Sequence, residues 1–120
     1  MIKCGVDVVE IQRLEVIQPA IRARFIQRVF TALELTQLGD DSEALAGVFA
    51  AKEAASKALG TGIGKVRWQD FEVIHAQTGE PELRLHGEAL RVALSRGLHE
   101  WAVSITHDGG LALAFVVAQG

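Results

Sequence analysis

Several residue types are rare or missing in this chain of 120 residues. It has no tyrosine, one cysteine, one methionine and two prolines. A single cysteine, Cys4, can form no disulfide within the chain, and its place in a predicted strand favours a small core residue over a reactive thiol. Proline is too rare, and apolar residues at 49% are too common, for a disordered chain. The sequence therefore predicts one compact domain over residues 1–120.

Long hydrophobic runs and a strong excess of one charge are also missing. The longest apolar stretches, such as Leu111 to Ala118, are far shorter than the ~20 residues of a membrane-spanning helix, and the N-terminus shows no apolar signal segment. These absences predict a cytoplasmic protein without membrane association. The formal net charge is −3. The chain as a whole would repel a nucleic-acid backbone, so we expect no nucleic-acid partner.

Apolar periodicity predicts strands at both ends of the chain and helices between them. The predicted strands are 2–9, 71–75, 83–86, 101–106 and 111–117. The predicted helices are two short ones between 11 and 30, one capped by Thr31 with Glu34 and ending at Gly39, one over about 43–59 capped by Ser42, and one over 87–96. The last strand is apolar throughout, which is typical of a strand buried on both faces. This order predicts an α+β domain in which helices cover one face of a mainly antiparallel sheet.

The predicted helix near the middle of the chain carries charged groups among alanines. Lys52, Glu53 and Lys57 project from a segment with little bulk between Phe49 and Leu59, so a ligand can approach closely, and phosphate chemistry is the first expectation. The run from Gly60 to Gly64 follows this helix instead of preceding one, and it lacks the lysine and hydroxyl of a P-loop. We therefore interpret it as the C-terminal cap of the helix, which can also touch a ligand.

Two carboxylates suggest a site for a hard cation. Asp7 lies in an apolar strand, where its charge needs an arginine, a helix N-terminus or a metal as a partner. Asp7 and Glu53 together could hold Mg²⁺, which typically takes one or two carboxylates and leaves its other positions to water and phosphate. Lys57, four residues after Glu53, fits either an exposed salt bridge or a group that stabilises a transferring phosphoryl centre.

Histidines and arginines supply further candidates. Thr106 and His107 end a predicted strand, where the imidazole can contact a phosphate or serve only as a turn residue. The other three histidines lack metal-ligand spacing, so no zinc site is expected. A basic stretch over residues 11–30 suggests an acidic partner, or alternatively a solvated helix face. Its arginines are Arg13, Arg22, Arg24 and Arg28.

Three sequence blocks resemble the holo-[acyl-carrier-protein] synthases in order and spacing. They are Gly5 to Ile11, Phe49 to Gly64 and Val103 to His107. Softer matches are Arg28 to Thr31 with Glu34, Asp70 to Val73 and Gly79 to Pro81. The resemblance spans nearly the whole chain. It implies the 4′-phosphopantetheinyl transferase fold and a homotrimer with active sites between subunits.

The resemblance also implies a reaction and roles for the matching residues. Coenzyme A would donate its 4′-phosphopantetheine arm to a serine of apo acyl carrier protein and release adenosine 3′,5′-bisphosphate, with Mg²⁺ as cofactor. Asp7 and Glu53 would bind the metal, Glu53 would help to deprotonate the serine, and Lys57 would neutralise the departing diphosphate. The basic stretch would dock the acidic recognition helix of the carrier. The expected contacts to coenzyme A are Lys52, Gly62, Gly64, Thr106 and His107.

One position departs from the family pattern. Val48 occupies a place where family members commonly carry arginine, which leaves the recognition of the coenzyme A 3′-phosphate open; Lys65, Arg67 or a neighbouring subunit are the alternatives. Two other functions also stay open, a non-catalytic trimeric binding module and a metal-dependent nucleotide hydrolase. The identity of the carrier protein does not follow from the sequence.

Overall fold

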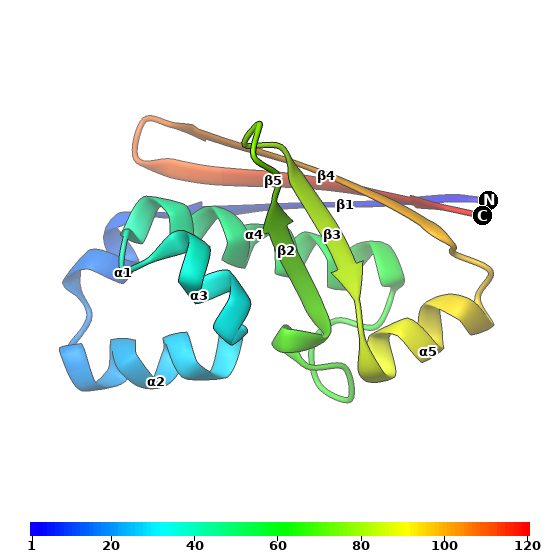
Figure 1. Cartoon of the computed structure of the whole chain (residues 1–120), viewed down its shortest axis with the longest axis horizontal. Coiled ribbons are helices and arrows are strands. Elements are labelled where there is room, and N and C mark those ends of the chain that lie inside the picture. Colours follow the sequence, from blue (N-terminus) through cyan, green and yellow to red (C-terminus); the bar gives the residue numbers. More distant parts are fainter.

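The predicted order of strands and helices is confirmed by the structure, a computed structural model that describes residues 1–120 (Figure 1). The strands are β1 (Ile2–Glu10), β2 (Phe71–His75), β3 (Pro81–Leu85), β4 (Glu100–Asp108) and β5 (Leu111–Gln119). The helices are α1 (Gln12–Val16), α2 (Pro19–Val29), α3 (Ala32–Leu38), α4 (Ser42–Leu59) and α5 (Gly87–Ser95), with a 3-10 turn η1 (Trp68–Asp70). The α+β class with antiparallel sheets is therefore confirmed.

The main sheet has three antiparallel strands in the order β1-β5-β4. Its register pairs Ile2 with Gln119, so the two chain ends lie side by side at one end of the sheet (Figure 1). Strands β2 and β3 form a separate hairpin. Helix α4 runs along one face of the main sheet, and the hairpin contacts both α4, through β2, and the sheet strand β4, through β3 (Figure 1). This arrangement makes α4 the central element of the domain.

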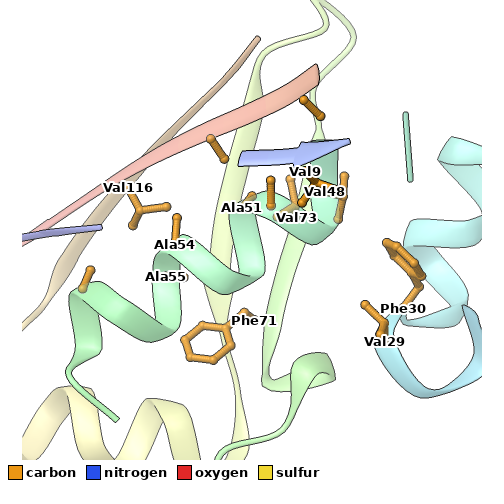
Figure 2. Packing of buried hydrophobic residues seen from close by; sticks show 14 of the residues in the cluster. Val9, Val29, Phe30, Val48, Ala51, Ala54, Ala55, Phe71, Val73 and Val116 are labelled. Carbon is orange, nitrogen blue, oxygen red and sulfur yellow. The ribbon is translucent and has the colours of Figure 1, made fainter. Parts of the chain in front are cut away.

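The contact between α4 and the sheet is built from small residues. Ala54 of α4 and Val116 of β5 face each other in this layer (Figure 2). The β5 residues that face α4 are Ala112, Ala114, Val116 and Ala118, all fully buried. Small side chains let a helix and a sheet approach closely at the packing density of a protein interior.

The prediction that β5 is buried on both faces is wrong for the single chain. Its alternate residues Leu111, Leu113 and Phe115 are exposed, because all helices that contact this sheet lie on its other face. The same open face carries Val6 and Val8 of β1. Cys4 also lies on this face and is exposed, so its predicted place in the core is a second correction.

The ends of α3 and α4 test the predicted helix caps. Thr31 and Glu34 form the expected capping box. Helix α4 is capped by Asp41, whose side chain accepts a hydrogen bond from the Glu43 amide, and not by Ser42, which is already its first helical residue. Gly60 ends α4 in the left-handed conformation (φ 89°), as predicted for a C-cap. The caps fix both ends of the helix that carries the candidate catalytic groups.

Candidate active site

Asp7 of β1 and Lys57 of α4 meet at the edge of the main sheet. The Lys57 ammonium donates to the Val6 carbonyl oxygen at 3.1 Å and to Asp7 Oδ1 at 3.3 Å. The Lys57 side chain is 53% exposed and that of Asp7 is 19% exposed. The strand therefore orients the ammonium while leaving about half of the Lys57 side chain open to solvent, where a ligand can reach it.

Glu53 lies one helical turn before Lys57 and is electrostatically coupled to the same pair. Partial burial raises the pKa of the Glu53 carboxyl, the nearby charge of Asp7 raises it further, and Lys57 lowers it. In this structure the ammonium pairs with Asp7, so the simple Glu53–Lys57 salt bridge is not formed. Two carboxylates and one ammonium leave a net charge of −1, a site that favours a proton or a cation.

The donor set fits Mg²⁺ better than a transition metal. No group of three or more metal-ligating side chains occurs in the chain, which argues against a cage made of protein ligands alone. Mg²⁺ keeps several waters and typically binds through one or two carboxylates and the phosphates of a substrate. Asp7 and Glu53 are the two carboxylates that would hold such a metal, next to an exposed lysine that suits a phosphate.

The glycine run turns back on the last turn of α4. The amides of Gly60 and Gly62 both donate to the Ser56 carbonyl oxygen, which satisfies a free group at the helix end. Gly62 has a φ of 65°, a conformation that side chains rarely adopt, and both Gly62 and Gly64 are exposed. The two glycines are thus available to a ligand beyond the C-terminus of α4.

His107 lies at the opposite end of α4. Its Nε2 donates to the Glu43 carbonyl oxygen at 3.0 Å in the first turn of the helix. From Glu43 to Leu59 the helix is about 24 Å long at 1.5 Å per residue. Within one chain, Thr106 and His107 therefore cannot contact the same nucleotide group as Gly62 and Gly64. The hollow at His107 is also acidic, since it is lined by Glu10, Glu15, Glu43 and Asp108.

Lys52 does not lie at the site, and its predicted contact with coenzyme A needs correction. Its side chain is fully buried, and its ammonium donates to Glu34 Oε1 at 2.7 Å and to the Trp68 carbonyl oxygen at 3.2 Å. Burial lowers the pKa of Lys52, an effect that Glu34 opposes. Lys52 and Glu53 are neighbours in sequence, but they project to different sides of α4, one into the interior and one toward Asp7.

The buried partner of Lys52 was not found from the sequence. The sequence predicts Glu34 as a capping residue and as part of a softer family match, and Glu34 does accept the Thr31 amide at 2.8 Å. It also accepts the amide of Val73 from β2 at 2.7 Å. One carboxylate thus joins α3, α4 and β2. A glutamate in the first turn of a short helix is the available signal, but a capping role already accounts for it.

The four arginines of the basic stretch divide into two kinds. Arg22 donates to the Leu14 carbonyl oxygen at 3.1 Å, to the Asp40 carboxylate and to Ser42 Oγ at 3.1 Å, so it joins α1, α2 and the start of α4. Arg13, Arg24 and Arg28 are exposed and form no ion pair within the chain. Of the four arginines in the basic stretch, only these three are free to meet an acidic partner.

Val48 is buried in the core, and the next residue lies in an aromatic cluster. The Phe49 ring is 5.0 Å from Phe25 and 5.0 Å from Trp68, measured between ring centroids. Val48 itself is 1% exposed (Figure 2). This position offers no polar group to a phosphate.

None of the helices combines the length and apolar character needed to cross a lipid bilayer.

Known proteins are similar to this chain in sequence and in fold. Residues 3–116 match the family model of the 4′-phosphopantetheinyl transferase superfamily. The chain is 41% identical to a holo-[acyl-carrier-protein] synthase of Herpetosiphon aurantiacus, and the match covers 100% of both chains. It superposes on the Helicobacter pylori holo-[acyl-carrier-protein] synthase, solved in complex with coenzyme A, with a TM-score of 0.87 at 32% identity, covering 97% of this chain and 99% of that one.

A second solved structure agrees. The holo-[acyl-carrier-protein] synthase of Neisseria meningitidis has a TM-score of 0.86 at 35% identity, with 100% of both chains covered. A family model over nearly the whole chain and a full-length relative above 40% identity leave one assignment. The chain belongs to the holo-[acyl-carrier-protein] synthase family, a group of enzymes within the 4′-phosphopantetheinyl transferase superfamily.

Proposed function

We propose that this enzyme acts in the cytoplasm and transfers 4′-phosphopantetheine from coenzyme A to a serine hydroxyl of apo acyl carrier protein. The reaction depends on Mg²⁺ and releases adenosine 3′,5′-bisphosphate. The observation that carries the proposal is the coupled set of Asp7, Glu53 and Lys57 in a chain of this family. The coenzyme A complex of the Helicobacter pylori relative supports the choice of donor.

The three groups take separate roles in the transfer. The serine oxygen attacks the β-phosphorus of coenzyme A, and the bond from that phosphorus to the bridging oxygen breaks. Glu53, directly or through a water, takes the serine proton; its raised pKa brings it closer to neutrality, where a general base works best. Lys57 stabilises the charge that develops on the departing phosphate, and Asp7 orients Lys57. Mg²⁺ held by Asp7 and Glu53 would neutralise the phosphate oxygens.

The nucleotide end of the donor needs residues from two chains in this proposal. Gly62 and Gly64 lie beyond one end of α4, and Thr106 and His107 lie at the other end. If both sets hold one nucleotide, they come from different copies of the chain. Position 48 carries valine and no basic group. A neighbouring copy would also supply that basic group, and we favour this copy as the source of 3′-phosphate recognition.

The open face of the main sheet supports assembly into a homotrimer. Val6 is 51% exposed, Val8 54% and Phe115 43%, on adjacent strands β1 and β5. A contiguous apolar surface of this kind on a soluble protein marks an interaction site. Packing against other copies would cover it, and the trimer is the assembly that the family resemblance implies.

The carrier protein would dock on the exposed arginines. Arg13, Arg24 and Arg28 present positive charge without internal partners, and an acidic surface would be attracted to them. Arg22 is excluded from this set because its guanidinium is occupied by Asp40. The attraction should weaken as salt is added, since screening shortens the range of exposed charges.

Mass spectrometry of apo acyl carrier protein tests the function directly. The carrier is incubated with this enzyme, coenzyme A and Mg²⁺, with EDTA in a parallel sample. We expect the mass of one phosphopantetheine group to be added to the carrier only when Mg²⁺ is present. Release of the nucleotide without carrier would indicate a hydrolase. If neither the modified carrier nor the released nucleotide is found with several carriers, the protein is a binding module and the proposed transfer is refuted.

A further inference from the structure

Strand β1 touches the backbone of α4 at Gly5. A Cβ atom added to Gly5 would lie 2.0 Å from the carbonyl oxygen of Ala54 and 2.9 Å from the amide nitrogen of Ala58. Both are backbone atoms of a helix interior, so no side-chain rotation can relieve the overlap. Any residue larger than glycine must move β1 and α4 apart.

Space is the reason for glycine at this position, and backbone conformation is not. Gly5 is absent from the glycines with positive φ, so an alanine could adopt its backbone angles. Gly47, the other glycine between α4 and the sheet, shows the contrast. Its added Cβ would meet only side-chain atoms of His107 and Ile105, at 2.7 and 2.9 Å, and side chains can yield. The contact at Gly5 is therefore the rigid one.

This rigid contact lies between the reactive groups. Gly5 and Asp7 are two residues apart and face the same side of β1. Ala54 and Ala58 directly follow Glu53 and Lys57 on α4. The strand and helix are thus in close backbone contact beside the 3.3 Å contact between Lys57 and Asp7. A change in that separation moves Asp7 relative to both partners at once.

We propose that Gly5 is a positioning residue for the transfer reaction, which sets the distance from Asp7 to Glu53 and Lys57 through its backbone contact with α4. The inference rests on the proposed function. Lengthening this 2.0 Å separation to ordinary contact requires a movement on the order of 1 Å, and a misplacement of about 1 Å at a catalytic site can cost about 100-fold in rate. The metal carboxylates would separate by the same movement.

The experiment compares Gly5→Ala with Val9→Ala in the full-length enzyme. Val9 faces α4 from the same strand, two residues beyond Asp7, and its truncation removes volume without pushing β1 outward. We expect Gly5→Ala to lower kcat by about 10- to 100-fold and to raise the Mg²⁺ concentration for half-maximal rate. Val9→Ala should keep kcat within about threefold of the wild-type value, even where it lowers the melting temperature as much as Gly5→Ala does, since truncation leaves the reactive groups in place. Equal losses in both variants would show a merely structural role and overturn the proposal.

A longer acid provides a second test. Asp7→Glu adds one methylene, so it should impair the wild-type background, where β1 cannot retreat, and partly restore kcat in Gly5→Ala. Absence of any restoration would contradict the proposed spacing. If Gly5→Ala does not fold, Asp7→Glu alone decides: a kcat and Mg²⁺ requirement like those of the wild type would overturn the inference, and a loss of tenfold or more would support it.

Metal binding separates this inference from the proposed function. If the wild-type enzyme transfers nothing to any carrier, the proposed function fails. The spacing is then tested by calorimetric titration of Mg²⁺ into the wild-type protein and into Gly5→Ala or, where that variant does not fold, Asp7→Glu. Val9→Ala is titrated in parallel as the control. Weaker Mg²⁺ binding by the variant than by both the wild type and Val9→Ala supports the role of Gly5, and equal binding refutes it.

Discussion

Lys52→Met should destabilise the fold without affecting the transfer chemistry. Lys52 and Glu34 form a fully buried ion pair, and Glu34 also accepts the backbone amides of Thr31 and Val73. Methionine has a similar volume, so the substitution removes the charge and leaves little cavity. It leaves the Glu34 carboxylate in the core with its amide partners but without its counter-charge.

The expected loss is large compared with the stability of the domain. Removing one partner of a buried ion pair typically costs about 3–5 kcal/mol. A domain of this length has about 6–18 kcal/mol in total, from about 0.05–0.15 kcal/mol per residue. With an unfolding entropy of about 0.25 kcal/mol/K for 120 residues, the melting temperature should fall by about 12–20 °C.

Thermal unfolding followed by circular dichroism measures the loss. Arg91→Met, which breaks the exposed pair with Glu88, is the matched control and should leave the melting temperature unchanged. Below the transition, Lys52→Met should retain the wild-type kcat and KM for coenzyme A. A fall of less than about 4 °C, near 1 kcal/mol by the same entropy, would refute the reasoning from burial. A raised KM with an unchanged melting temperature would return Lys52 to the donor site.

Three further predictions concern the site, the carrier surface and the open sheet face. Glu53→Gln should abolish transfer. Because the folded protein raises the pKa of Glu53, the ionised carboxylate destabilises the fold at a pH above that pKa and has no effect where Glu53 is protonated. The variant should therefore raise the melting temperature of the metal-free protein at pH 8 but not at pH 4. A variant no more stable than wild type at pH 8 would contradict this coupling. Arg24→Glu should raise KM for the carrier and leave KM for coenzyme A unchanged, whereas Arg22→Gln should mainly lower the melting temperature; an unchanged carrier KM would mean that Arg24 is only solvated. Phe115→Glu should reduce the assembly to monomers in light scattering, and an unchanged mass would place the interface elsewhere.

Local patterns predicted most of the secondary structure. The 18-residue helix α4, its glycine cap and the capping box of Thr31 with Glu34 all depend on residues close in sequence. Strand positions also followed from period-two alternation. Which face of a strand packs against the helix did not follow, because alternation groups the residues of each face without assigning either face to the core.

The candidate site was predicted in part, for a related reason. Asp7 and Lys57 are 50 residues apart, and the motif resemblance brought them together where spacing could not. Lys52 was misplaced because adjacent charged residues on an alanine-rich helix look alike in sequence. Its burial depends on Glu34 of α3 and on the Trp68 carbonyl oxygen of η1, which only the tertiary fold brings within reach.

The distribution of side-chain size across β5 indicates a second packing surface on the face that α4 leaves open. Three of its four residues that face α4 are alanines, whereas Leu113 and Phe115 point outward. A strand with an outer face meant for water would place polar residues there. Bulky apolar residues on the outside, and small ones where the helix must come close, indicate two packing surfaces with different partners. The helix covers one, and other copies of the chain are the partner we propose for the second. That assembly would bury the residues that the sequence predicted to be buried, and it would bring a second copy of α4 and of His107 close enough for the two halves of the donor site to meet.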